Sequence, residues 1–221
     1  MKVFASRDNL PDLTTLEAVR CFVSYRGHGD NQPRVHGNGF IQLDLTPRSR
    51  LHVWGHPYIP RQKVATPIHD HIFSFTSYVL WGRLINVVYA ENAPYTVVTQ
   101  GLPTGRFFEP HVREQGSGSE DQVLWARDQS SHSLSVKDVQ IVNAGESYQL
   151  NHGVLHESIA PEIAVSVIQK SGPTMGQGAV ARPRVFVPEG LEPDNEFNRY
   201  TAASRELLWE IISLALSAEE A

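Results

Sequence analysis

The chain has 221 residues, of which 41% are hydrophobic, and this is enough for one domain with a substantial core. Its formal net charge of −5, without a run of basic residues, argues against nucleic acid as the main partner. The single cysteine, Cys21, excludes an internal disulfide, and no stretch approaches the roughly 20 apolar residues of a membrane span. We therefore expect a cytoplasmic protein without a membrane partner.

Residues 1–39 are expected to form a helix followed by a loop. Thr14 and Glu17 have the spacing of a capping box, in which each side chain bonds the backbone N–H of the other residue. Apolar residues follow at helical spacing. The helix is predicted to end near Arg26, before the glycine-rich stretch 27–39.

Residues 40–170 have the pattern of a β-barrel or sandwich. Segments 40–45 and 50–54 alternate apolar and polar residues and are separated by a Pro-Arg-Ser turn. Further short strands, bounded by turn signals, are predicted at 74–80, 83–89, 95–100, 134–142, 147–150 and 164–169. Short strands at this spacing are typical of an all-β fold.

A pair of histidines lies between the second and third of these strands, in Thr66-Pro67-Ile68-His69-Asp70-His71. Side chains at i and i+2 of a β-strand point to the same face, so a strand here would present His69 and His71 together. Two neighbouring neutral imidazoles are a ligand pair for a divalent metal. The alternative is an ordinary polar strand end, since short motifs recur by chance.

Two segments of the chain have little strand pattern. Segment 101–133 contains the stretch 115–121, QGSGSED, which is expected to be an exposed tip; whether it is a lid is left open. Residues 171–221 are predicted to be a wrapping loop, rich in glycine and proline, and then a helix from Thr201 with apolar residues at i, i+3, i+4 spacing. That helix and the exposed strand edges are compatible with a homodimer. The three parts, 1–39, 40–170 and 171–221, are expected to form one compact domain.

A third histidine follows a strand between two glycine turns. Gly145 lies in the turn before this strand, Gly153 ends the turn after it, and His156 comes three residues later. A histidine at this place is expected to face inward from the next strand. It would then join the earlier pair.

Together these histidine motifs resemble the two motifs of the cupin superfamily, in which the first is His-x-His followed by a glutamate and a glycine. Gly82 occupies the glycine place, whereas Phe75 stands at the glutamate position, so the usual carboxylate ligand is absent. The resemblance covers roughly residues 40–170. It implies an all-β, cupin-like jelly-roll barrel with flanking N-terminal and C-terminal helices. It also implies a metal site with the ligands His69, His71 and His156.

Three histidines without a glutamate are similar to the thiol dioxygenase branch, which includes cysteine dioxygenase. That branch has an arginine on an early strand, and segment 40–43 here contains none. It also has a Ser-His-Tyr trio on the last strand, where this chain has Ser166, Ile168 and Lys170. The resemblance therefore implies the metal site but not the substrate.

Residues near the expected ligands are candidates for other parts of the site. His52, His152 and Ser166 are candidate catalytic residues, and His152, which lies in a turn, is favoured as a rim residue over a base. The candidate contacts for a small-molecule substrate are Gln42, Phe75, Tyr78, Ile168 and Lys170.

Three neutral histidines leave the charge of a divalent ion uncompensated and leave coordination positions open, as in catalytic sites. We therefore predict a metal-dependent cupin, a mononuclear non-haem iron dioxygenase-like oxidoreductase for a small organic substrate. Fe(II) is favoured, with Zn, Ni or Mn as alternatives, because imidazole ligands do not choose among these metals. Two other functions stay open: an isomerase or lyase that uses the ion as a Lewis acid, and a non-catalytic cupin that binds small molecules.

Overall fold

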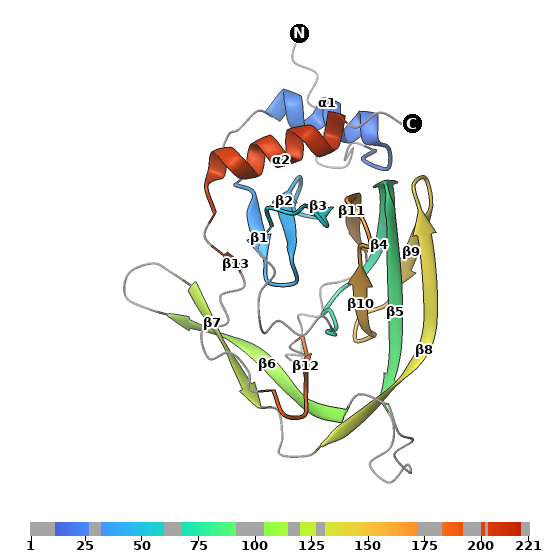
Figure 1. Cartoon of the computed structure of the whole chain (residues 1–221), viewed down its shortest axis with the longest axis vertical. Coiled ribbons are helices and arrows are strands. Elements are labelled where there is room, and N and C mark those ends of the chain that lie inside the picture. Colours follow the sequence, from blue (N-terminus) through green and yellow to red (C-terminus); the bar gives the residue numbers. More distant parts are fainter. Residues whose placement is uncertain are drawn as a thin grey trace.

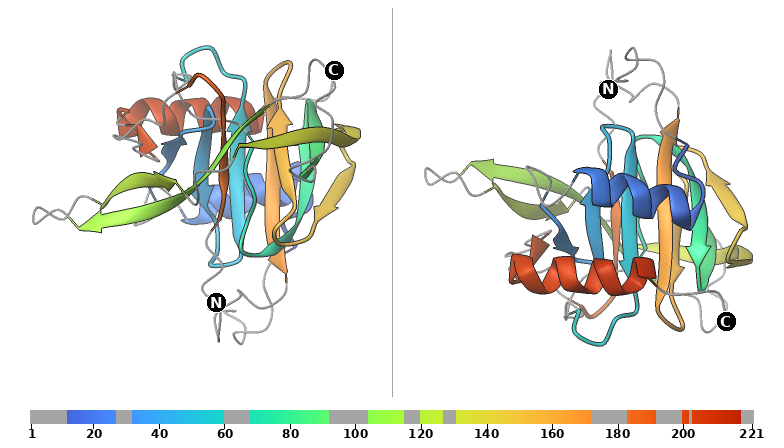
Figure 2. Two further views of the ribbon diagram at one scale, coloured as in Figure 1. Left: turned by 90° about the horizontal axis from the view of Figure 1, so that it is seen from below. Right: turned by 90° about the horizontal axis from the view of Figure 1, so that it is seen from above.

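The computed structural model describes residues 12–26, 32–59, 68–91, 104–114, 120–126, 131–171, 183–191, 200–201 and 203–217. Two helices, α1 (Leu16–Arg26) and α2 (Arg205–Ser217), lie across one face of a β-sandwich (Figures 1 and 2). Within these ranges, neither helix combines the length and the apolar composition that crossing a bilayer requires.

The strands form two antiparallel sheets, here called sheet A and sheet B. Sheet A has the order β13-β1-β2-β3-β11-β4-β9, with β1 (Arg34–His36), β2 (Phe40–Asp44), β3 (Ser49–Trp54), β4 (Ser74–Trp81), β9 (Ser147–Leu150), β11 (Ala164–Ser171) and β13 (Tyr200–Thr201). Sheet B has the order β10-β5-β8-β6-β12, with β7 paired to β6; its strands are β5 (Arg83–Glu91), β6 (Thr104–Glu114), β7 (Glu120–Ala126), β8 (His132–Asn143), β10 (Leu155–Ile159) and β12 (Val185–Pro188).

The chain passes repeatedly from one sheet to the other. Strand β4 of sheet A leads to β5 of sheet B, and β8, β9, β10 and β11 then alternate between the sheets. Such crossings between two packed antiparallel sheets are typical of a jelly roll. The prediction of an all-β jelly-roll barrel with flanking N-terminal and C-terminal helices is confirmed.

A glycine permits the sharp passage from β4 to β5. Gly82 has a φ of +70°, and a Cβ atom at this position would lie 2.4 Å from the carbonyl oxygen of Ile163. Any side chain would therefore meet both backbone strain and a clash.

Sheet A has two apolar faces because its central strands are covered on both sides. The face toward the helices carries Ile41, Leu43, Leu51, Val53, Val165 and Val167, which belong to the same buried cluster as the apolar side of α2. The opposite face points into the barrel and carries Phe40, Trp54, Phe75, Val79 and Ile168, which pack with residues of sheet B. The candidate site lies inside the barrel, and this second face forms part of its wall.

The first helix has the predicted extent but a different cap. The side-chain oxygen of Thr15 accepts a bond of 3.2 Å from the backbone N–H of Ala18, whereas Thr14 bonds to Asp12. The capping box expected between Thr14 and Glu17 is therefore wrong by one residue. Thr15 satisfies a backbone N–H in the first turn.

Two stretches without a clear strand pattern contain strands. Segment 101–133 holds β6 and β7, which form a hairpin that projects from the sandwich (Figure 1). The expected wrapping loop after residue 170 contains β12, which pairs with β6. The sheets thus take strands from outside 40–170. Residues 115–119 of the expected tip and the strand predicted at 95–100 lie outside the described residues.

Candidate metal centre

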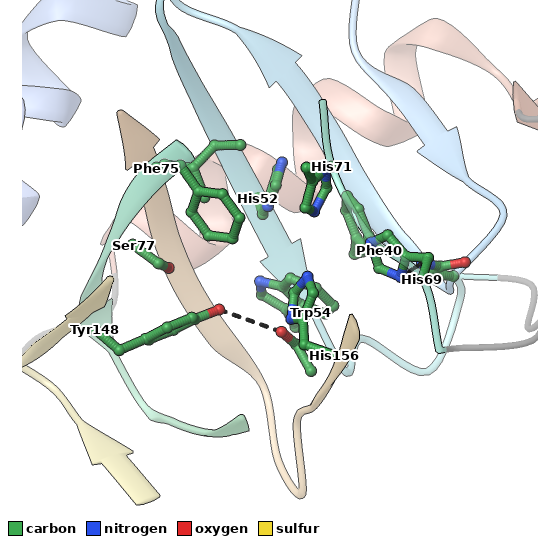
Figure 3. A pocket seen from close by; sticks show the side chains of 12 residues that line it. Phe40, His52, Trp54, His69, His71, Phe75, Ser77, Tyr148 and His156 are labelled. Carbon is green, nitrogen blue, oxygen red and sulfur yellow. Dashed lines mark hydrogen bonds between the residues drawn. The ribbon is translucent and has the colours of Figure 1, made fainter. Parts of the chain in front are cut away.

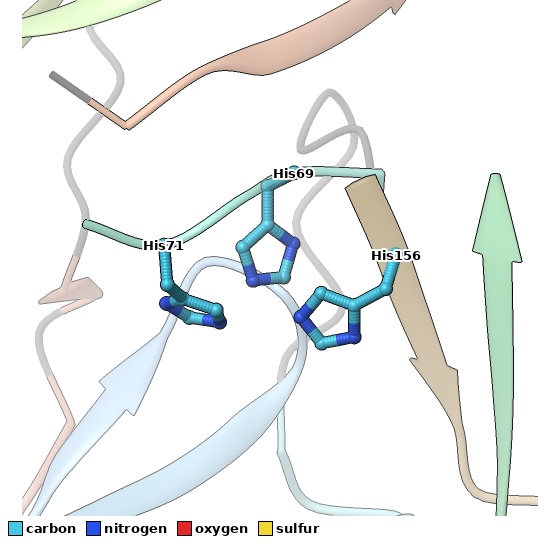
Figure 4. A group of neighbouring side chains, drawn as sticks. All are labelled: His69, His71 and His156. Atoms are coloured by element: carbon cyan, nitrogen blue, oxygen red, sulfur yellow. The ribbon is translucent and has the colours of Figure 1, made fainter. Parts of the chain in front are cut away.

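Three histidines from two distant parts of the chain meet inside the barrel (Figure 4). His69 and His71 lie in segment 68–71, and His156 lies on β10. One ring nitrogen from each lies within 4.8 Å of the others. The ring centroids are 4.8 Å apart for His69 with either neighbour, and 5.3 Å apart for His71 with His156. The predicted ligand residues are therefore brought together.

Segment 68–71 is not a strand, so that part of the prediction is wrong. His69 forms isolated bridges on both sides, with His156 of β10 and with Val185 of β12. The backbones of His69 and His156 exchange two hydrogen bonds of 2.9 Å each. Bends at residues 72 and 73 follow before β4 begins, so no longer ladder forms. The histidine rings still reach a common point.

The orientation of His156 is fixed by a residue that the sequence analysis missed. Its Nδ1 lies 3.0 Å from Oδ1 of Asn86, and both residues are buried. With Nδ1–H as the donor, the lone pair of Nε2 is directed away from Asn86, and this atom has no protein partner. Burial, reinforced by neighbouring His69, holds the pKa of His156 well below its ordinary value. The ring is therefore neutral, as a metal ligand must be.

These donors fit a divalent ion. Nitrogens bound to one ion at about 2.1 Å lie roughly 3.0–3.4 Å apart, so the rings need to close by about 1–2 Å around it. His69 and His71 are only partly buried, which leaves their side chains room for this adjustment. A buried ring nitrogen without a partner, aimed toward two further imidazoles, is what a metal would satisfy.

A small pocket opens beside the three histidines (Figure 3). Besides them, its lining consists of Asn38, Phe40, His52, Trp54, Phe75, Ser77, Tyr148, Ser158 and Ile168. The cavity volume of about 40 Å³ has room for roughly three water molecules. An organic substrate is larger than this cavity, so only part of it could lie inside and the rest would extend outward. The walls are mainly aromatic, and none of these residues carries a carboxylate or an amine.

His52 lies on the pocket wall, against the ring of Phe40 at 4.5 Å between centroids. Its Nε2 atom is buried without a hydrogen-bond partner. Burial lowers the pKa of His52 to about 3, and the positive charges of Arg50 and Lys170 act in the same direction. His52, one of the three candidate catalytic residues, is thus a neutral polar group in an apolar wall.

The other two catalytic candidates do not line the pocket. Ser166 is fully buried and accepts a 3.0 Å hydrogen bond from Nε1 of Trp54, so it supports the wall from behind. His152 is exposed in the turn before β10, where its backbone N–H donates to Oγ of Ser74. His152 therefore lies outside the described lining of the pocket.

The five substrate candidates divide between pocket and surroundings. Phe75 and Ile168 line the pocket. Tyr78 packs on the helix-facing side of sheet A, so its expected contact is wrong. Positions 75 and 78 of one strand are three apart and cannot share a face. Gln42 is buried and donates to Asp44 at 3.4 Å, and Nζ of Lys170 lies 5.0 Å from the ring centre of Phe73; neither residue lines the pocket.

No protein-family model and no curated protein matches the chain. Among solved structures, it is similar to hydroquinone 1,2-dioxygenase from Sphingomonas sp. TTNP3 with 4-hydroxybenzoate bound, at 8% identity and a TM-score of 0.30. That alignment covers 58% of this chain and 63% of the other, which is less than two thirds of its length. A second is hydroquinone 1,2-dioxygenase PnpCD in complex with Cd²⁺ and 4-hydroxybenzonitrile, at 10% identity, a TM-score of 0.28, and coverage of 78% and 83%. Similarity at this level assigns neither site nor activity, so both rest on this chain's own side chains.

Proposed function

We propose that the chain is a mononuclear metal-dependent oxidoreductase, a dioxygenase that inserts both atoms of O₂ into a small organic substrate. The buried Nε2 of His156, without a protein partner and directed toward His69 and His71, is the observation that carries the proposal. Three protein ligands leave coordination positions open. When bound, Fe(II), the proposed metal, would supply a redox centre for O₂.

The pocket chemistry favours this function over an isomerase or lyase. Those reactions usually need a general base with a pKa near the working pH. Among the residues that the structure describes, the pocket lining has no carboxylate or amine, and the low pKa of His52 makes its ring a weak base. Burial raises the pKa of Tyr148, so its hydroxyl stays protonated and serves as a hydrogen-bonding group.

The same lining suggests the kind of substrate. Phe40, Trp54, Phe75 and Ile168 make the lining largely apolar and aromatic, which suits an apolar or aromatic molecule. His52 is a polar residue of this lining, and its buried Nε2 has no hydrogen-bond partner. Because the described part of the lining contains no lysine or arginine, the positive charge of the metal would neutralise an anionic group of the substrate.

The test begins with metal analysis of protein purified without a chelating tag. The wild type is compared with His156→Ala and with His152→Ala, a matched control in the neighbouring exposed turn. We expect close to one iron per chain in the wild type and the control, and loss of iron in His156→Ala. Oxygen consumption is then measured with Fe(II) and a panel of small phenols and thiols, and we expect it to require His156.

The other outcomes separate the alternatives. Zinc or nickel in the wild type, with a reaction that proceeds without O₂, would replace the dioxygenase with Lewis-acid catalysis. No metal in any of the three proteins, even after reconstitution, would leave a binding protein with buried histidines.

A further inference from the structure

The segment that carries two of the three candidate ligands has little regular structure to hold it. Each edge of segment 68–71 makes only single-residue bridges, through His69 to β10 and to β12. The bridge to β12 consists of two 3.0 Å hydrogen bonds, from the backbone N–H of Phe186 to the carbonyl of Ile68 and from that of Asp70 to the carbonyl of Arg184. Beyond the bridges, the backbone N–H of Gly153 donates to the carbonyl of His71 at 2.9 Å. A segment with so few ladder bonds needs other contacts to keep its side chains in place.

Asp70, which lies between the two histidines, makes those contacts. Its side chain is 5% exposed, and Oδ2 accepts a 2.6 Å hydrogen bond from Nε of Arg184. Oδ1 accepts a second bond of 2.6 Å from the backbone N–H of Arg184. The backbone N–H of Asp70 in turn donates to the carbonyl of Arg184 at 3.0 Å. Three hydrogen bonds thus join two residues that are 114 positions apart.

Arg184 is itself fixed by three further elements. One terminal nitrogen lies 3.2 Å from Oε2 of Glu91 at the end of β5. The other donates to the carbonyl of Gly153 at 3.3 Å, in the turn before β10. The guanidinium also lies over the ring of Phe107 in β6, 4.9 Å from its centre. A planar group with this many partners has one orientation.

We propose that Asp70 and Arg184 are positioning residues that hold segment 68–71 so that His69 and His71 meet His156. Asp70 shares a peptide unit with each histidine, so a displacement of its backbone moves both rings together. Arg184 connects that backbone to β5, to β6 and to the turn that precedes His156. The proposal rests on the metal site of the proposed function, but it requires neither O₂ nor a particular substrate.

The test measures metal affinity rather than activity. Co(II) is titrated into metal-free wild type and Asp70→Asn, and binding is followed by the visible absorption of the ion. The matched control is Asp44→Asn, which removes a carboxylate that also bonds two arginines, Arg34 at 2.5 Å and Arg50 at 2.9 Å. We expect Co(II) affinity to fall about 10–100-fold in Asp70→Asn, as for supporting residues of other metal sites, and less than about 3-fold in the control. The Co(II) spectrum should also change only in Asp70→Asn.

A second variant covers the case in which Asp70→Asn does not fold. Arg184→Lys keeps the positive charge and the backbone N–H but removes the planar donor group. Its Co(II) affinity is expected to lie between that of Asp70→Asn and that of the control Asp44→Asn. The proposal is wrong if these variants unfold at lower temperature than the wild type but bind Co(II) with unchanged affinity and spectrum, because the pair would then be only a stabilising contact. If the wild type binds no Co(II), Fe(II) or Zn(II), the proposed metal site itself fails.

Discussion

At the scale of single residues, Asn86 occupies a position where a polar side chain is costly. It is fully buried in β5, and its Nδ2 atom has no partner, so part of its hydrogen-bonding capacity is left unsatisfied. The contact that it does make is with Nδ1 of His156. The presence of a buried asparagine here is therefore explained by its hydrogen bond to His156, which orients the imidazole ring.

Replacing Asn86 should therefore weaken metal binding more than it weakens the fold. Asn86→Leu removes the acceptor for Nδ1–H of His156, and we expect metal affinity to fall about 10–100-fold. Asn86→Asp keeps an acceptor at the same place and should bind metal within a few-fold of the wild type. Competition with a chromophoric chelator measures both values. Equal affinities for Asn86→Leu and the wild type would show that the contact has no role in metal binding.

The three candidate ligands could be predicted from the sequence because their spacing and glycine turns are local patterns. Their supporting residues could not. Asn86 appears in the sequence only as one polar residue within the apolar run 84–88. Asp70 and Arg184 are joined across 114 positions, which no local pattern reveals. The error for Tyr78 could have been avoided from the sequence. Phe75 and Tyr78 are three positions apart on one strand, so they point to opposite faces and only one of them can line the pocket.

At the scale of elements, α2 is amphipathic. Its buried residues are Leu208, Trp209, Ile211, Ile212, Ala215 and Leu216. They pack with the helix-facing side of sheet A, opposite to the pocket. The helix should therefore contribute to stability without touching the metal centre.

A matched pair of substitutions in α2 tests this separation. Ile212→Ala removes a fully buried side chain and should lower the free energy of unfolding by about 2–5 kcal/mol. Leu214→Ala, at a position that is 59% exposed, should change it by less than about 0.5 kcal/mol. Both variants should bind metal like the wild type. Chemical denaturation and metal titration check the two statements, and a loss of metal in folded Ile212→Ala would contradict the second.

Elements with strong local patterns were predicted well, and those that depend on distant pairing were not. The strands near 40–54, 74–89 and 164–169 alternate or are continuously apolar, and all are present. Strand β12 has four residues within a stretch rich in glycine and proline, and it exists because β6 pairs with it. Strand β6 contains Gly105 and Pro110, both of which are unfavourable in strands. Segment 68–71 was predicted as a strand from its local pattern, but it makes only isolated bridges with β10 and β12 through His69.

At the scale of the whole molecule, sheet A separates two apolar layers. One contains α1, α2 and the outer face of the sheet, and the other contains the pocket and the inner face of the barrel. The candidate ligands come from segment 68–71 and from β10. An ion would therefore contact only the barrel side of sheet A. Its binding free energy would add to the stability that the packing of the helices provides.

Metal should raise the thermal stability of the folded chain. A ligand that binds only the native state stabilises it by RT ln(1 + [L]/Kd), which is about 2.7 kcal/mol at 100 times the Kd. We expect the melting temperature to rise with Fe(II) or Co(II) under anaerobic conditions and to return with EDTA. His156→Ala should show no rise. An equal rise in that variant would place the ion elsewhere.

The two backbone hydrogen bonds between His69 and His156 join segments that are far apart in the sequence. A metal bound between these segments would also affect the unfolded chain. An ion held by side chains of both segments would be a cross-link across the middle of the sequence. With its single cysteine, this chain cannot form an internal disulfide to the same effect. In the chain-entropy model, closing a loop of about 100 residues is worth about 4.7 kcal/mol. A chain that keeps its ion while it unfolds would remain looped, and the distant segments that form the centre would stay close together for refolding.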